Sequence, residues 1–190
     1  MLMLLLIGIV LRSGSVFAAE VAGPAFRAPG IGRIDHLKAA FLLNIARFVS
    51  WPDAIQRNQD APLYLCLYRS NSLQPAIENI SEKSAYRHPI EVILIRTLNE
   101  IASCNILFIG PSDLEAFQQE AAPMPNPPVL TIADLTKRNS MRAEPVSVHV
   151  HLVPSESRIG FEVNLDKLRR SGLWMSSKLL KLARIIGGAD

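Results

Sequence analysis

The chain has 190 residues, with 20 Lys and Arg against 17 Asp and Glu, and 49% of its residues are hydrophobic. This length fits one domain with a sizeable core, and so high an apolar share excludes a mainly disordered chain. The net charge of +3 is small for a chain of this length. A nucleic-acid-binding surface needs a dense band of Lys and Arg, so we expect no nucleic-acid partner.

Residues 1–18 resemble a cleaved secretory signal peptide. The apolar run at residues 1–11 is too short for a transmembrane helix, which takes about 20 residues. Val16 and Ala18 are the small residues expected before a cleavage site that follows Ala18. No Lys or Arg precedes the apolar run, so the Met1 amine or an upstream start would have to supply the positive charge. A buried N-terminal segment and an uncleaved anchor are the alternatives to export.

The remainder of the chain divides into a leader and one domain. Residues 19–33 contain Gly and Pro without periodicity and predict a flexible leader. Residues 34–190 predict a single α/β domain.

The two cysteines lie in two strand-like runs, Cys66 within residues 63–68 and Cys104 at the start of residues 104–109. In an oxidising compartment two thiols usually form a disulfide. Two buried free thiols are the alternative. A structural zinc site needs more than two cysteines, and the chain has no CxxC motif.

Residues 35–50 predict a long helix, with Asp35 as N-cap and Pro52 shortly beyond its end. Apolar side chains occupy nearly every side of this helix, interrupted by Lys38, Asn44 and Arg47. Such a helix is buried on more than one side, either in its own core or against a partner.

Short apolar runs then alternate with helical patterns. This order is typical of a parallel sheet that is covered on both faces. The fold class expected is therefore a three-layer α/β domain with a mostly parallel sheet and a C-terminal antiparallel hairpin plus helix. We expect strands at residues 63–68, 90–95, 105–109 and 129–132, and helical segments at residues 73–81, 98–102 and 112–119, the last capped by Ser112.

The expected hairpin joins residues 146–153 to residues 158–163 through a four-residue turn. Pairing Val153 with Arg158 places His151 opposite Gly160 and His149 opposite Glu162. One face is then apolar and belongs to the core: Val148, Val150, Leu152, Ile159, Phe161 and Val163. The opposite face is expected in water: His149, His151, Arg158 and Glu162.

His149, His151 and Glu162 are also the weak candidates for a metal site. Two His on one strand face with a carboxylate across from them can supply three zinc ligands. An exposed hairpin face is the simpler interpretation, and we expect no metal.

The C-terminal segment predicts helices at residues 165–170 and 176–186, with Asn164 capping the first. Lys178, Lys181 and Arg184 would share one side of the second helix. This side is either a solvated face or a contact for an anionic lipid or an acidic partner. Four residues would face the core: Leu179, Leu182, Ala183 and Ile186.

Catalytic and cofactor motifs are missing from the sequence. It contains no GxSxG, GxxxxGK[ST] or GxGxxG. Ser176-Ser177-Lys178 is interpreted as a helix start. We therefore expect no enzyme and no cofactor.

Two long stretches resemble the YfiR family. Residues 37–52 (LKAAFLLNIARFVSWP) are similar to its opening helix. Residues 158–165 (RIGFEVNL), followed by Ser171-Gly172-Leu173 and residues 176–183 (SSKLLKLA), are similar to its closing signature. The similarity extends over residues 37–186.

This resemblance implies a periplasmic α/β protein that binds the periplasmic sensor region of an inner-membrane diguanylate cyclase. Repression of the cyclase would lower cyclic di-GMP and biofilm formation. The resemblance also implies a homodimer and a disulfide between Cys66 and Cys104. Relatives accompany sensor kinases and outer-membrane receptors as well, so a sensor kinase is an alternative partner. The candidate contact residues are Phe41, Arg47, Phe48, Trp51, Lys178 and Lys181.

Two further hypotheses belong to other functional classes. One is a periplasmic small-ligand sensor, with a pocket at the carboxyl ends of the strands near Ser70, Gly110 and Asp134. The other is a metal-dependent enzyme built on His149, His151 and Glu162.

Overall fold

The computed structural model describes residues 32–52, 61–70, 72–81, 89–122, 126–137, 146–156 and 158–187. The predicted signal peptide, and the predicted leader up to residue 31, lie outside the described residues. Ile31–Asp190 form one compact unit. Within the described part of the chain, no helix combines the length and the apolar character needed to cross a membrane.

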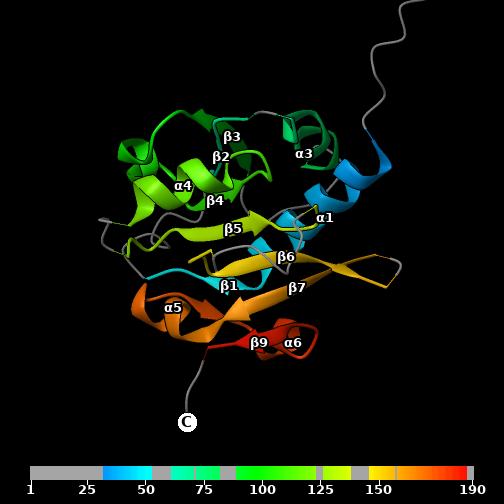
Figure 1. Cartoon of the computed structure of the whole chain (residues 1–190), viewed down its shortest axis with the longest axis vertical. Coiled ribbons are helices and arrows are strands. Elements are labelled where there is room, and N and C mark those ends of the chain that lie inside the picture. The colour runs from blue at the N-terminus through cyan, green and yellow to red at the C-terminus, as the bar shows by residue number, and fades with distance from the viewer. Residues whose placement is uncertain are drawn as a thin grey trace, which may run out of the picture. The chain divides into compact units, whose positions relative to one another are not determined.

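A seven-stranded sheet with the order β3-β2-β4-β5-β6-β7-β9 forms the centre of this unit (Figure 1). Neighbouring strands from β3 to β6 are parallel, β6 and β7 form an antiparallel hairpin, and β9 pairs in parallel with β7. The mostly parallel sheet predicted from the short apolar runs is confirmed. The strands are β2 (Leu63–Tyr68), β3 (Ile90–Ile95), β4 (Ile106–Ile109), β5 (Leu130–Asp134), β6 (Val150–Ser155), β7 (Arg158–Asn164) and β9 (Arg184–Ile186).

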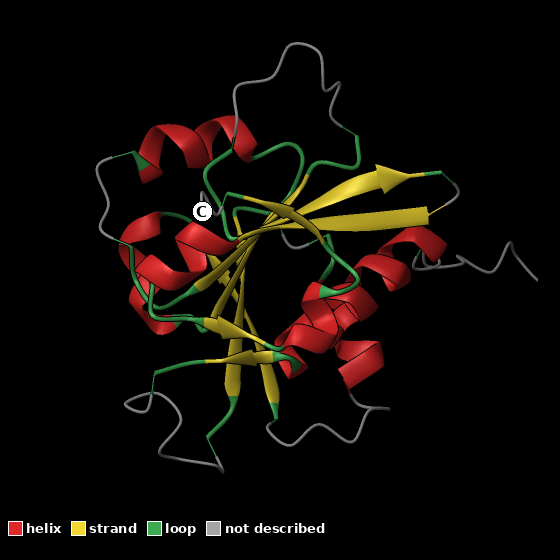
Figure 2. Cartoon of the chain, turned by 90° about the horizontal axis from the view of Figure 1, so that it is seen from below, coloured by secondary structure: helices red, strands yellow, loops and turns green. Residues whose placement is uncertain are grey.

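Helices cover both faces of the sheet (Figure 2). The helix α1 (Arg33–Arg47) and the helix α3 (Gln74–Ser81) pack on one face, and the 3-10 helix η1 (Leu98–Ser103) and α4 (Leu114–Ala121) pack on the other. Alternation along β2 separates the two cores: Leu65 and Leu67 belong to the first, and Cys66 and Tyr68 to the second. The predicted three-layer architecture is confirmed.

The bounds of α1 differ from those predicted. The N-cap is Gly32, and Asp35 lies in the first turn, where a carboxylate interacts favourably with the helix dipole. The helix ends at Arg47 because the next residues form β1 (Val49–Ser50). This strand pairs antiparallel with β8 (Trp174–Met175) in a separate two-stranded sheet. The tertiary pairing with β8 therefore ends the helix before residue 50.

The N-cap of α4 is Asp113 and not Ser112, and the helix continues to Ala121. The 3-10 helix η1 has a capping box in which Thr97 and Glu100 exchange side-chain contacts with each other's backbone. The observed ends of η1 and α4 differ from the predicted ends by one or two residues. Helix ends are the least well-defined part of such elements.

The hairpin register differs from the predicted one by two residues. Ser155 pairs with Arg158, Val153 with Gly160, and His151 with Glu162. Pro154 therefore lies inside β6, which is tolerated because β5 pairs with β6 only from Val150 to Leu152. A shift of two residues leaves every side chain on its predicted face. All six residues predicted for the core are buried: Val148, Val150, Leu152, Ile159, Phe161 and Val163.

The prediction that the opposite face of the hairpin is in water is wrong for three of its four residues, and the side chain of the fourth, Arg158, lies outside the described part of the structure. His149, His151 and Glu162 are only 2%, 7% and 6% exposed. The segment that enters β6 lies over this face, because the Val146 carbonyl oxygen is 2.8 Å from His151 Nε2. The residue after α5 (Leu165–Arg170), Ser171, lies against His149. The chain that precedes and follows the hairpin therefore removes its polar face from water.

The predicted helix at residues 176–186 is also wrong. Only α6 (Ser177–Leu180) is helical, and the chain then turns and forms β9 against β7. Leu179 is buried as predicted, whereas Leu182, in the turn, is 75% exposed. Strand pairing at the edge of the sheet overrides the helical periodicity of this short segment. The predicted cap of α5 is confirmed, since Asn164 Oδ1 accepts a 2.9 Å hydrogen bond from Lys167 N.

Candidate functional site

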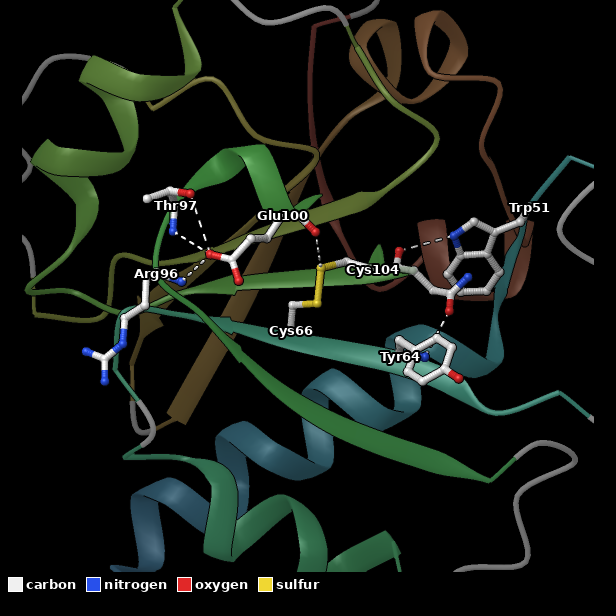
Figure 3. Close-up of a disulfide and its surroundings, with 8 residues drawn as sticks. Trp51, Tyr64, Cys66, Arg96, Thr97, Glu100 and Cys104 are labelled. Carbon is white, nitrogen blue, oxygen red and sulfur yellow. Dashed lines mark hydrogen bonds between the residues drawn. A yellow bond between two sulfur atoms is a disulfide. The ribbon is translucent and has the colours of Figure 1, made fainter. Parts of the chain in front are cut away.

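A disulfide joins Cys66 to Cys104, with 5.7 Å between the two Cα atoms (Figure 3). Cys66 lies in β2, and Cys104 lies between η1 and β4. Both residues are buried, at 0% and 5% exposure. Because β2 and β4 are neighbours in the sheet, the bond ties η1 to the central strand β2.

Two polar clusters flank this disulfide (Figure 3). Glu100 accepts hydrogen bonds from the backbone N–H groups of Arg96 (3.0 Å) and Thr97 (3.1 Å), which lower the pKa of its carboxyl group. On the other side, the Trp51 indole donates to the Asn105 carbonyl oxygen at 3.2 Å. Trp51 is only 8% exposed. It joins the chain after α1 to the core and does not present a surface for a partner.

The structure separates the other candidate contact residues into two groups. Phe41 is half-buried and makes an edge-to-face contact with Phe161, with ring centroids 6.1 Å apart. Phe48 is 38% exposed, at the end of α1. Its carbonyl oxygen accepts a 2.8 Å hydrogen bond from Ser176 N, which brings this end of α1 to the start of α6.

Arg47, Lys178 and Lys181 are exposed on these two adjoining segments. Trp174, in β8, lies a few residues before α6, and its side chain is 73% exposed. The sequence analysis did not identify Trp174 as a candidate contact residue. An apolar run from Leu173 to Met175 carried no signal that its central side chain is exposed. We call Phe48, Trp174, Lys178 and Lys181 the α1–α6 surface.

His149 has both ring nitrogens engaged inside the protein. Its Nδ1 lies 3.0 Å from Thr131 N and 2.8 Å from Thr131 Oγ1, and its Nε2 lies 2.9 Å from Ser171 Oγ. A backbone N–H can only donate, so Nδ1 is the acceptor and Nε2 carries the hydrogen. Burial lowers the pKa of His149 to about 3, with the Lys167 charge adding to the effect, and the ring is therefore neutral at pH 7.

This tautomer bears on catalysis. In a Ser–His hydrolase the imidazole Nε2 accepts the serine proton, whereas here His149 Nε2 donates to Ser171 Oγ. His149 consequently cannot act as a base toward Ser171 without losing both contacts with Thr131.

His151 and Glu162 lie side by side, as their pairing in the hairpin requires. His151 Nδ1 is 3.4 Å from Glu162 Oε2, and the other Glu162 oxygen pairs with Arg184. His149 faces Thr131 and Ser171 instead, so the three candidate metal ligands do not converge. In the part of the chain that the structure describes, no three His, Cys, Asp or Glu side chains are grouped to hold a metal ion.

The expected ligand pocket at the carboxyl ends of the strands has its charged groups paired internally. Asp134, at the end of β5, forms an ion pair with Lys38 of α1. Arg69, which follows β2, pairs with Glu120 of α4. The Leu98 backbone N–H donates to Glu120 at 3.0 Å and, with Arg69, lowers the pKa of its carboxyl group.

A pocket of about 50 Å³ lies elsewhere, at the amino end of β5 between η1, α4 and α5. The sequence analysis missed it, because its walls come from segments far apart in the chain. Lys167 Nζ lies in its wall, 3.3 Å from Asn126 Oδ1 and 3.2 Å from Ser147 Oγ. The full lining is Leu98, Ile101, Ala121, Asn126, Pro127, Val129, Thr131, Ser147, His149, Lys167 and Ser171.

The layered sheet and the disulfide define a disulfide-linked α/β domain, and the tautomer of His149 opposes catalysis by the His149–Ser171 pair. The sequence profile of the YfiR/HmsC-like family matches residues 35–184. The match runs from the first turn of α1 to the start of β9, and the chain belongs to this family. Members of the family are regulators rather than enzymes.

Proposed function

We propose that this protein is a periplasmic repressor of an inner-membrane diguanylate cyclase. It binds the periplasmic sensor region of the cyclase and thereby lowers cyclic di-GMP and biofilm formation. The observation that carries the proposal is the family match over residues 35–184. The match includes both cysteines and all four residues of the α1–α6 surface.

Two features support a location outside the cytoplasm. The Cys66–Cys104 disulfide is of a kind that persists in oxidising compartments such as the periplasm. The apolar run at residues 1–11 and the small residues Val16 and Ala18 suit a cleaved signal peptide. We therefore propose export, cleavage after Ala18 and action in the periplasm.

The α1–α6 surface is the proposed contact with the cyclase. Two exposed aromatic side chains, Phe48 and Trp174, lie on segments that the Ser176–Phe48 hydrogen bond joins. Exposed aromatic residues are enriched at protein interfaces, and large exposed side chains often become their anchors. Lys178 and Lys181 add positive charge, which favours an acidic partner surface.

Repression requires that the protein bind one state of the cyclase more tightly than the other. A ligand with equal affinity for both states shifts no equilibrium, however tightly it binds. Moving a two-state equilibrium from mostly active to mostly inactive takes a preference of about 10⁴-fold. The proposed contact therefore involves a part of the sensor region that changes shape between the two states.

We also propose a homodimer, which light scattering of the purified protein would show as twice the chain mass.

The proposal is tested by measuring cyclic di-GMP in a strain that lacks this gene. Deletion should raise cyclic di-GMP, and the full gene should restore it. A gene that lacks residues 1–18 should fail to restore it, because the product stays in the cytoplasm. The exported Lys178→Glu/Lys181→Glu variant should restore it poorly, and Lys137→Glu, at an exposed lysine after β5, should restore it fully. Unchanged cyclic di-GMP after deletion would contradict the proposal and direct the search to sensor kinases.

A further inference from the structure

The pocket at the amino end of β5 differs from the other polar sites because its side chains have hydrogens to donate and few free acceptors. Lys167 of α5 carries three Nζ hydrogens. Asn126 Oδ1 and Ser147 Oγ accept two of them, at 3.3 and 3.2 Å. The third Nζ hydrogen, the Asn126 amide hydrogens and the Ser147 hydroxyl hydrogen remain for another group.

Ser171 adds a further donor through the fixed tautomer of His149. Thr131 N and Thr131 Oγ1 both donate to His149 Nδ1, so His149 Nε2 donates to Ser171 Oγ at 2.9 Å. The Ser171 oxygen is thus used as an acceptor, and its own hydrogen is free to donate. Ser171 is 5% exposed and lines the pocket, so this hydrogen lies where water is scarce.

The charge in this pocket has no counter-ion in the described part of the chain. No described Asp or Glu forms an ion pair with Lys167. Burial, together with the neighbouring Arg170 charge, lowers the pKa of Lys167, as expected for a partly desolvated ammonium group that lacks a carboxylate partner.

We propose that this pocket binds the oxyanion group of a small ligand, a carboxylate or a phosphate, between Lys167, Ser171, Ser147 and Asn126. Charge-assisted hydrogen bonds to an oxyanion would use every remaining donor and neutralise the Lys167 charge. The volume of about 50 Å³ accommodates a few water-sized positions. It therefore holds one such group, while the rest of the ligand extends outward past the exposed residues Asn126 and Ser147.

This proposal goes beyond the repressor function and does not rest on it. The ligand group would join α5 to the segments that enter β5 and β6. A small molecule in the compartment could in this way change how firmly the C-terminal part of the domain is held. Binding can be measured on the purified protein without any partner.

The probes are sodium phosphate, sodium acetate and sodium chloride, added to the purified exported chain at matched ionic strength. The measurements are isothermal titration calorimetry and the amide chemical shifts of residues 167 and 171. Phosphate or acetate should bind saturably with one site per chain, and chloride should not. The stronger of the two identifies the ligand class as phosphorylated or carboxylic.

The variants separate this site from general attraction to a basic protein. Lys167→Met should weaken binding about tenfold or more, because a charge-assisted contact is lost. Lys167→Arg should retain most of the affinity, and Lys137→Met, at the opposite end of β5, should retain all of it. Circular dichroism establishes that each variant is folded.

Equal binding by Lys167→Met and the wild-type protein would overturn the proposal. So would binding that rising ionic strength weakens equally in the wild-type protein and in Lys167→Met, since that behaviour indicates screening of surface charge alone. Ser171→Ala gives an independent check, because it removes one donor and leaves the charge in place. It should weaken binding less than Lys167→Met does.

Discussion

Lys38 of α1 and Asp134 at the end of β5 form an ion pair inside the protein, with 2.5 Å between Lys38 Nζ and Asp134 Oδ2. Their side chains are only 5% and 1% exposed. The other Asp134 oxygen accepts hydrogen bonds from Thr136 N (2.9 Å) and Thr136 Oγ1 (2.6 Å). The pair joins α1 to the carboxyl end of β5. Because Asp134 is already paired with Lys38, its carboxylate is not free to bind a ligand there.

Removing Lys38 alone should therefore destabilise the fold strongly. Lys38→Met leaves Asp134 buried without its counter-ion, which costs about 3–5 kcal/mol of unfolding free energy. Urea unfolding followed by circular dichroism measures this loss. The double variant Lys38→Met/Asp134→Leu should be more stable than Lys38→Met, because it contains no unpaired charge. Lys137→Met is the matched control and should stay within about 0.5 kcal/mol of wild type. A loss below about 1 kcal/mol for Lys38→Met would show that water reaches Asp134.

The disulfide should stabilise the domain mainly through the unfolded chain. Cys66 and Cys104 are 38 residues apart, and closing a loop of this size is worth about 4 kcal/mol in the chain-entropy model. Cys66→Ala/Cys104→Ala should lose about this amount in urea unfolding. A reducing agent should lower the stability of the wild-type protein and leave the double variant unchanged. Equal stability of the oxidised protein and the double variant would mean that the strands hold this region without the bond.

His149 should make stability depend on pH in the acid range. The unfolded chain binds a proton at His149 near its ordinary pKa of 6.5, whereas in the folded protein the pKa is about 3. Between these values the unfolded state holds more protons, so the free energy of unfolding falls as the pH decreases from 6.5 toward 3. Well above pH 6.5 both states are neutral at this residue, and the stability is fully present. The total loss is on the order of 5 kcal/mol.

Urea unfolding at a series of pH values measures this effect. His149→Gln should show a flatter profile between pH 6.5 and 3, although its stability at pH 7 is lower because contacts with Thr131 and Ser171 change. Asn44→Gln, at an exposed residue of α1 that does not titrate, should keep the wild-type slope. An unchanged slope in His149→Gln would assign the acid sensitivity to the carboxylates.

The parallel part of the fold was predictable because its strands are short apolar runs buried on both faces. Cys66 and Cys104 lay in two of these runs, so their pairing was within reach of the sequence. The hairpin faces were predictable from alternation, but their burial was not. Nothing in the local pattern of His149 and His151 shows that Val146 and Ser171 will cover them.

The structure of the C-terminal segment and the position of the pocket could not be predicted from the sequence, because both depend on contacts between distant segments. Leu179 and Leu182 suit one face of a helix, and only the pairing of β9 with β7 turns Leu182 out to solvent. The pocket brings Asn126, Ser147 and Lys167 together from three separate loops and helices. Local pattern determines an element's type when the element is long and periodic, whereas tertiary pairing decides short segments and sites assembled from several elements.

Charge reversal on α6 should weaken the proposed partner contact without unfolding the domain. Lys178 and Lys181 are exposed, and neither forms an ion pair with a described residue, so Lys178→Glu/Lys181→Glu should stay within about 1 kcal/mol of wild-type stability. Reversing charges at the edge of an interface acts chiefly on the association rate, which should fall about tenfold at low salt and less at high salt. Surface plasmon resonance against the purified periplasmic region of the cyclase measures both rates. Lys137→Glu is the control for net charge. If Lys137→Glu slows association as much as the α6 variant does, the effect comes from the overall charge and the contact lies on another face.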